Sequence, residues 1–417
     1  MASARPASGP HVLRRMNRLA VLAAVRSAAA PVSIARLIER TGLSRPAVTR
    51  ALSDLAGLGV VERLDAGPPP GNIGRPAQQV RFRSELGFVA GLDIGTHGVH
   101  VILADLLGHA VAELQTPAGP TGTDIADTAA DAIQRCAASA GLDPADLWAI
   151  AVGTPGVVNA ETGEIRLAPS IPGWAGLPVA ETLSRRHGCP VHIDNDMNLA
   201  ALAEQSNGAA KGVDNFVYVS WDERVGAGIV IGGRPYRGAS SAAGELGFVD
   251  LTGDLDRTPD RPPAPAPHHS IVDGAGGFER LVGAKAVRDL ALETCADGTE
   301  LYATVRDTPL DRIGPVLFDR AESGDPVAAA ICDRIVARFS AGLAVLIMLI
   351  DPGVVILGGC MTGAGEPLLR RLHRSLDIRL FSPPRLVLSS LREQTIALGA
   401  IESALTTAEK RLLQMCA

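Results

Sequence analysis

The first part of the chain carries apolar residues three and four positions apart, which is the spacing of one buried helical face. This pattern is found in residues 16–29, 34–38 and 48–55. Ser33 and Ser44 stand before the second and third of these segments, where a serine hydroxyl caps a helix N-terminus. The pattern therefore predicts three short helices.

Two short strands are predicted to follow the third helix, over residues 60–64 and 79–82. The loop between them, residues 65–76, is rich in Gly and Pro, which is typical of a turn. Three helices followed by a two-stranded wing form a winged helix-turn-helix. We therefore predict a DNA-binding domain, with its linker, over residues 1–86.

From residue 87 onward, apolar strands alternate with helices, a pattern that predicts an α/β architecture. The predicted strands are residues 88–94, 99–105, 148–153, 191–193, 215–220, 227–232 and 354–359. The predicted helices are residues 124–140, 326–350 and 395–415.

The charge of the chain is divided unevenly, although the net charge of all 417 residues is only −6. Residues 1–86 contain 13 Arg and five acidic residues, a net charge of +8, so the remaining residues carry −14. A basic first domain on an acidic body indicates that the first domain meets a polyanion.

Side chains suited to DNA contact lie on the predicted third helix and on the wing. Ser44, Arg45, Thr49 and Arg50 share the open face of that helix, where short polar groups and arginines reach base edges and phosphates. Arg75 lies on the Gly- and Pro-rich loop, from which an arginine can enter a narrow minor groove. We predict that these five residues bind double-stranded DNA; the alternative is a helical hairpin that contacts another protein.

Cysteine usage and the apolar runs bear on the compartment. The six cysteines are scattered without a CxxC pair, which argues against a disulfide framework and favours a reducing cytoplasm. The apolar run at residues 341–350 is too short for a bilayer, which needs about 20 residues. We predict a cytoplasmic protein that contacts no membrane.

Seven short motifs mark the body in a fixed order. They are GLDIG (91–95), VGTPG (152–156), IPGW (171–174), DNDMN (194–198), VGAG (225–228), AGELG (243–247) and DPGVVILGG (351–359). Residues 87 to about 410 therefore resemble the ROK family (repressors, open reading frames, kinases) of the sugar-kinase and actin superfold. The resemblance implies a two-lobed, actin-like (ribonuclease H-like) body. Its first lobe would be residues 87–200, joined by the C-terminal helix 395–417, and its second lobe residues 201–394.

The resemblance also implies a sugar site. In a ROK sugar kinase an Asn-Asp pair holds the sugar, its Asp takes the hydroxyl proton during phosphoryl transfer, and a Glu bonds sugar hydroxyls. Asn195, Asp196 and Glu245 match these positions. We therefore predict that they bind an effector, with Asp196 as a vestigial catalytic base; the alternative for Asp196 is a loop or capping carboxylate.

Both phosphate loops depart from the kinase pattern. His97 stands where the first loop has a Thr, and Asp222, Glu223 and Arg224 replace the Gly-Thr-Gly of the second. Glycines let backbone amides approach a phosphate, whereas side chains, two of them carboxylates, oppose that approach. We expect a disabled ATP site, no kinase activity and no cofactor.

The family's structural zinc site has lost its ligands as well. Phe248 replaces its His, and Ser270, Val272 and Gly277 stand at its three Cys positions. No thiolate remains to bind zinc by this route, so we expect no metal. Phe248 also removes a sugar contact, and a sugar hydroxyl left unpaired there costs roughly 1–3 kcal/mol.

The sequence thus predicts a repressor of carbohydrate-metabolism genes that responds to a sugar or sugar derivative. We expect a homodimer or homotetramer on a pseudo-palindromic operator. Two alternatives stay open: an ATP-dependent ROK sugar kinase, and a regulator whose body serves only for dimerisation. The altered phosphate loops disfavour the kinase, while Phe248 keeps the effector-independent regulator open.

Overall fold

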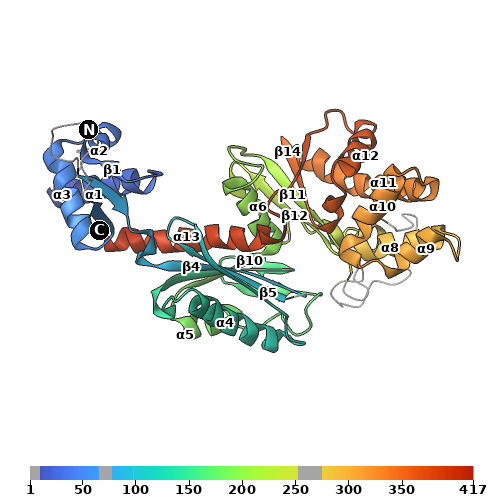
Figure 1. The fold of residues 1–417 in the computed structure, drawn as a ribbon, viewed down its shortest axis with the longest axis horizontal. Helices are drawn as coiled ribbons and strands as arrows, with labels where there is room; N and C mark the ends of the chain where they lie inside the picture. Colours follow the sequence, from blue (N-terminus) through green and yellow to red (C-terminus); the bar gives the residue numbers. More distant parts are fainter. Residues whose placement is uncertain (1–9, 65–77, 97, 252–274, 417) are drawn as a thin grey trace, which may run out of the picture.

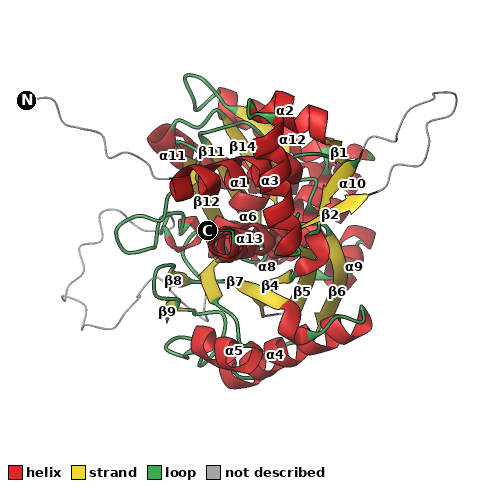
Figure 2. Cartoon of the chain, turned by 90° about the vertical axis from the view of Figure 1, so that its left-hand side faces the viewer, coloured by secondary structure: helices red, strands yellow, loops and turns green. Residues whose placement is uncertain are grey.

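A computed structural model describes residues 10–64, 78–96, 98–251 and 275–416. Figure 1 shows three parts along its longest axis: a small head, a first lobe and a second lobe. Helix α13 (Thr395–Met415) runs along the first lobe and ends at the head, where it packs in one cluster with the first helix of the chain. Figure 2 looks along α13 from the side of the head.

The head is a winged helix-turn-helix, as predicted. Its helices are α1 (Pro10–Arg26), α2 (Ile34–Thr41) and α3 (Arg45–Gly57). Its antiparallel strands, in spatial order, are β1 (Val32–Ser33), β3 (Gln79–Phe82) and β2 (Val61–Leu64). The first helix begins six residues earlier than predicted, because its opening turns are exposed and carry little of the apolar pattern. Strand β1 has only two residues and was not predicted.

The first lobe is built on a five-stranded mixed sheet. In spatial order its strands are β10 (Val191–Asn195), β7 (Leu147–Thr154), β4 (Phe88–Gly95), β5 (Gly98–Asp105) and β6 (Ala110–Thr116). Helices α4 (Gly122–Ser139) and α5 (Val179–His187) cover one face, and α13 covers the other. The short hairpin β8 (Val157–Asn159) and β9 (Glu164–Leu167) follows β7. Because β10, β7 and β4 are parallel, their carboxyl ends meet at one edge of the sheet, facing the second lobe.

The second lobe has a five-stranded sheet of its own. In spatial order its strands are β13 (Arg234–Pro235), β12 (Val225–Ile231), β11 (Phe216–Trp221), β14 (Val354–Gly358) and β15 (Arg385–Leu388). Its helices include α7 (Glu279–Val282), α8 (Ala284–Thr294), α9 (Glu300–Asp307), α10 (Ile313–Glu322), α11 (Pro326–Ile350) and α12 (Glu366–Asp377). Trp221 of the sheet stacks on Phe339 of α11 with ring centroids 3.6 Å apart, which fixes this long helix on the sheet.

Helix α6 (Asp196–Ser206) lies between the two lobes, against α13 on one side and the second-lobe sheet on the other. Both contacts are made by glycines. A Cβ atom on Gly399 of α13 would stand 1.8 Å from the carbonyl oxygen of Leu199, and one on Gly228 of β12 would stand 2.1 Å from that of Met197. The absence of a side chain therefore lets the backbones touch, and α6 is clamped between its neighbours.

The predicted fold class, a winged helix-turn-helix joined to a two-lobed α/β body, is confirmed. The predicted helices at 326–350 and 395–415 have the observed limits, and α4 spans 122–139 against a predicted 124–140. The predicted lobe boundary at residue 200 falls inside α6 and stays a prediction. No helix among the described residues is long and apolar enough to cross a membrane.

Candidate functional site

Helix α3 presents four of the residues predicted to contact DNA. The hydroxyl of Ser44 caps this helix, accepting a hydrogen bond from the N–H of Ala47 at 3.4 Å. The buried face of the helix is the predicted one: Val48, Ala51, Leu52 and Leu55. Ser44, Arg45, Thr49 and Arg50 are exposed. Arg75, the fifth predicted contact, lies outside the described residues.

Asn195 and Asp196 lie where β10 ends and α6 begins. The side-chain oxygen of Asn195 accepts hydrogen bonds from the N–H groups of Met197 and Asn198, at 2.9 and 3.2 Å, and so caps α6. Its Nδ2 donates to the carbonyl oxygen of Gly156 at 3.0 Å. Asn195 is therefore held by both the helix and the loop after β7, and Asp196 follows it as the first residue of α6.

A second contact joins two of the sequence motifs beside this cap. The indole Nε1 of Trp174 donates to the hydroxyl of Thr154 at 2.8 Å, and both side chains are fully buried. Thr154 ends β7 and stands opposite Asn195 in the sheet. The loop carrying Trp174 is thereby fixed close to the carboxyl end of β10.

Three carboxyl groups from the two lobes interact in this region. Burial raises the pKa of Asp196 to about 6. Burial, and then the negative charge of Asp196, raise the pKa of Asp93 to about 7 and that of Glu245 to about 7. The structure thus brings Glu245 from the second lobe within electrostatic range of Asp196. Whether these residues bind an effector stays a prediction. Near neutral pH such carboxyls both donate and accept hydrogen bonds, which suits a polyhydroxylated ligand.

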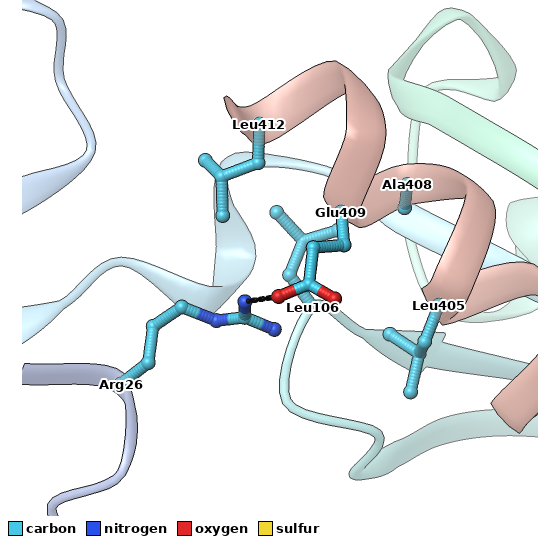
Figure 3. Close-up of a pocket in the computed structure, with 6 residues that line it drawn as sticks. All are labelled: Arg26, Leu106, Leu405, Ala408, Glu409 and Leu412. Atoms are coloured by element: carbon cyan, nitrogen blue, oxygen red, sulfur yellow. Dashed lines mark hydrogen bonds and ion pairs between the residues drawn. The ribbon is translucent and has the colours of Figure 1, made fainter. Parts of the chain in front are cut away.

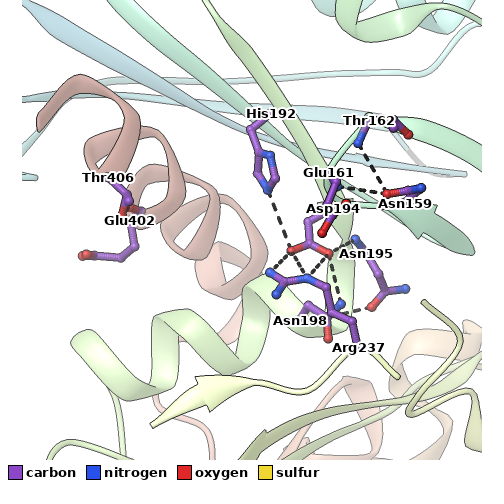
Figure 4. A network of polar contacts seen from close by, with 10 residues as sticks. All are labelled: Asn159, Glu161, Thr162, His192, Asp194, Asn195, Asn198, Arg237, Glu402 and Thr406. Atoms are coloured by element: carbon purple, nitrogen blue, oxygen red, sulfur yellow. Dashed lines mark hydrogen bonds and ion pairs between the residues drawn. The ribbon is translucent and has the colours of Figure 1, made fainter. Parts of the chain in front are cut away.

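An arginine of the second lobe, which the sequence did not single out, contacts the first lobe beside these carboxyl groups. Arg237, in the loop after β13, binds the carboxylate of Asp194 with Nη2 at 2.5 Å and Nε at 3.1 Å (Figure 4). Asp194 belongs to the DNDMN motif, but nothing in the sequence pairs that motif with a loop arginine 43 residues away.

Asp222 occupies a position that the sequence predicted to oppose a nucleotide. Its carboxylate accepts hydrogen bonds from the N–H of Cys360 at 2.6 Å and from the hydroxyl of Ser220 at 3.0 Å. A Cβ atom on Gly359 would lie 2.7 Å from Asp222 Oδ2. A carboxylate of the chain itself therefore covers the backbone of the DPGVVILGG motif. Glu223, beside it, is exposed, and His97 lies outside the described residues.

The segment that the sequence matched to the family's zinc motif is held by hydrogen bonds. Glu279 is buried, and its carboxylate accepts from the N–H groups of Gly276 and Val225 at 2.7 and 3.1 Å. Arg224 lies 3.4 Å from the same carboxylate. Among the described residues, no three His, Cys, Asp or Glu side chains are grouped as metal ligands would be. Ser270 and Val272 lie outside that part of the chain, and Phe248 is partly buried.

The head is joined to the body at the end of α13. Arg26 of α1 forms an ion pair of 2.7 Å with Glu409 of α13, beside Leu412 and Leu106 (Figure 3). The guanidinium of Arg26 also lies 5.6 Å from the ring centroid of Phe82 in the wing. One hydrophobic cluster runs without a break from the head core through α13 to the first-lobe sheet.

The sequence profile of the ROK family matches residues 89–406, most of the chain. The chain belongs to the ROK family. The profile of the IclR helix-turn-helix domain matches residues 17–65, which include all three head helices except the start of α1.

Relatives of this ROK protein include regulators and kinases. The chain is 24% identical to a xylose repressor of Caldicellulosiruptor bescii, over 94% of this chain and 95% of that one. It superimposes with a TM-score of 0.72 on a ROK family transcriptional regulator, a homologue of the E. coli MLC protein, at 22% identity (97% and 98% coverage). The body also matches a ROK glucokinase from Streptomyces griseus in complex with glucose and AMPPNP. The identity is 26% and the TM-score 0.63, over 77% of this chain and 100% of that one.

The raised pKa of Asp196 predicts a pH-dependent stability. Because this pKa lies above the value of 3.8 for a free Asp, the protonated carboxyl favours the fold at low pH, and that contribution is lost as the pH rises through about 6. The stability of Asp196→Asn relative to the unchanged protein should therefore rise between about pH 4 and 6 and stay level above that, by up to about 3 kcal/mol in all. Denaturant unfolding at a series of pH values measures the difference.

Glu181→Gln is the matched control, because this carboxylate is exposed on α5. It should leave the pH profile of stability unchanged. An Asp196→Asn profile parallel to that of the unchanged protein would contradict the burial and charge coupling described above.

Proposed function

We propose that this ROK protein is a DNA-binding transcriptional repressor whose operator affinity changes when a sugar binds between its two lobes. We assign residues 1–86 to the DNA-binding head, 87–200 with 395–417 to the first lobe, and 201–394 to the second. A repressor acts where the genome is, so the predicted cytoplasmic location follows from this proposal.

The observation that carries the proposal is a continuous packing route from the candidate sugar site to the head. Asp196 begins α6, α6 packs on α13, and the last turns of α13 pack into the head core. Leu412 and Cys416 are buried there, at 2% and 0% exposure. A ligand that shifts α6 also shifts the position of α13, because the two backbones touch at Gly399.

The effector class that we propose is an aldose or a derivative of one. Carboxyl and amide groups converge from both lobes, which suits several hydroxyl groups at once. A relative that matches the chain over nearly its full length is named a xylose repressor, so D-xylose heads the panel of sugars to be tested. The aromatic side chain of Phe248, three residues after Glu245, favours an effector with an apolar edge there.

A sugar kinase is the second candidate, because the pKa of Asp196, raised to about 6, suits a general base near neutral pH. We place it second because the carboxylate of Asp222 already binds the N–H of Cys360, the residue directly after the DPGVVILGG motif. An approaching phosphate would meet that negative charge.

The chain should accordingly show no transfer of the γ-phosphate of ATP to D-glucose or D-xylose. A steady phosphorylated product that disappears in Asp196→Asn would establish the kinase instead.

We further propose that two copies bind one operator, with a homotetramer as the alternative. An apolar stripe on the outer face of α11, at helical spacing, is a candidate contact between copies. It contains Val345, Met348 and Leu349, at 51%, 52% and 78% exposure. A two-fold pair of heads matches the two half-sites of a pseudo-palindrome.

The DNA-binding role predicts the behaviour of arginine variants. Footprinting on the DNA that flanks its own gene should reveal a protected site, and a sugar from the panel should change that protection. Arg45→Ala and Arg50→Ala should each weaken binding about tenfold and lower the salt dependence by about one counterion. Arg185→Ala, which removes an exposed arginine from α5, should have no effect. Undiminished affinity in both head variants would refute the assignment of α3.

The packing route predicts that the end of α13 carries the sugar signal. Leu412→Ala removes a buried contact between α13 and the head, whereas Leu413→Ala trims the next residue, which is 39% exposed. Leu412→Ala should bind the sugar normally but lose most of the sugar-dependent change in operator affinity, and Leu413→Ala should retain it. Calorimetry for the sugar and gel shifts for DNA measure the two quantities separately. Equal responses in the two variants would show that the signal takes another route.

A further inference from the structure

An ion pair joins the two lobes directly beside the candidate sugar site. Asp194 ends β10 of the first lobe together with Asn195, and Arg237 belongs to the loop after β13 of the second lobe. Figure 4 shows the guanidinium of Arg237 against the carboxylate of Asp194, next to Asn195 and Asn198. Nη2 and Nε of the arginine both donate to Oδ2, at 2.5 and 3.1 Å, and Nε also lies 3.4 Å from Oδ1, so two donors of one guanidinium fix its orientation as well as its distance.

The carboxylate of Asp194 is buried and surrounded by hydrogen-bond donors. Its side chain is 0% exposed, while that of Arg237 is 31% exposed. Besides the arginine, Asp194 accepts hydrogen bonds from the N–H of Asn195 at 2.8 Å and from Nδ2 of Asn198 at 3.0 Å. Without the arginine these two donors would remain, with Nε2 of His192 4.0 Å from the carboxylate, an imidazole whose pKa burial lowers. The buried carboxylate would lose its closest cationic partner, which favours separation of the lobes and entry of water.

The loop that carries Arg237 also carries Glu245. The carbonyl oxygen of Arg237 accepts a hydrogen bond from the N–H of Ala243 at 3.1 Å, which closes the intervening residues into a compact loop. The carbonyl oxygen of Gly244 then accepts from the N–H of Ala227 in β12 at 2.9 Å. The arginine and the glutamate are therefore fixed to one another and to the second-lobe sheet, so they move as a unit.

We propose that Arg237 is a positioning residue that holds the two halves of the sugar site at their working separation. On one side of the ion pair, Asp194 is bonded to Asn195 and precedes Asp196 by two residues. On the other, the loop of Arg237 presents Glu245. The pair thus opposes the repulsion between the carboxyl groups of Asp196 and Glu245, and it sets how far the lobes stand apart before a ligand arrives. The role in ligand binding rests on the proposed function; the role in lobe separation does not.

Spin labels on the two lobes test the separation in the full chain. Glu181→Cys on α5 and Arg374→Cys on α12 are both at exposed positions, and Cys360→Ala removes the one native cysteine that is not buried. In this background Arg237→Gln should widen the distribution of label distances and shift it to longer values, and Arg237→Lys should restore part of the change. Arg234→Gln, an exposed arginine on β13, is the matched control and should leave the distribution unchanged.

Calorimetric titration with D-xylose and D-glucose tests the effect on ligand binding. One of the two sugars should bind the unchanged protein. Arg237→Gln should weaken the affinity for that sugar about tenfold, because the lobe separation that binds the sugar is less populated. Operator affinity without sugar supplies a readout that shows the variant is folded. If neither sugar binds the unchanged protein, the proposed effector class fails while the label distances still decide on the ion pair. Label distances in Arg237→Gln that match those of Arg234→Gln would overturn the proposal.

Discussion

The arrangement of this molecule depends on one close contact, the backbone crossing of α6 with α13. A side chain at Gly399 would stand 1.8 Å from a backbone oxygen of α6, and a second glycine contact, at Gly228, presses α6 onto the second-lobe sheet. Helices that touch in this way cannot slide without separating, because packed interiors have almost no free volume. The candidate sugar site, the lobe interface and the base of the head are therefore mechanically connected through a single short helix.

Repulsion between carboxyl groups at the candidate sugar site opposes the packing of the two lobes. Three carboxyl groups with raised pKa values meet between the lobes, which stores repulsion where the lobes must approach. The ion pair of Arg237 with Asp194 supplies attraction beside these carboxyl groups. At the head, by contrast, the side chains of the Arg26–Glu409 ion pair are 24% and 49% exposed, and such a pair contributes little energy. The apolar cluster around it therefore carries the attachment.

Much of the fold follows from local patterns. Helix α3, its cap at Ser44 and its four buried residues were predictable because spacing and capping act within a few positions. The motif residues Asn195, Asp196 and Glu245 were predictable through the family resemblance. The pairs Arg237–Asp194, Cys360–Asp222 and Arg26–Glu409 were not, because their partners are 43, 138 and 383 residues apart. The first and third depend on lobes or domains packing together, and the second depends on the pairing of β11 with β14; no short sequence window records either. The roles proposed for the DNA-contact and sugar-contact residues stay predictions.

The hydrogen bond from Cys360 to Asp222 has a consequence for what the protein can sense. An anion that belongs to the chain is present at a constant effective concentration, whereas a bound nucleotide comes and goes with its supply. The N–H of Cys360, after β14, therefore keeps the carboxylate of Asp222 as its partner whatever the supply of nucleotide. Under the proposed function, such a body would report the abundance of a sugar independently of the supply of nucleotide.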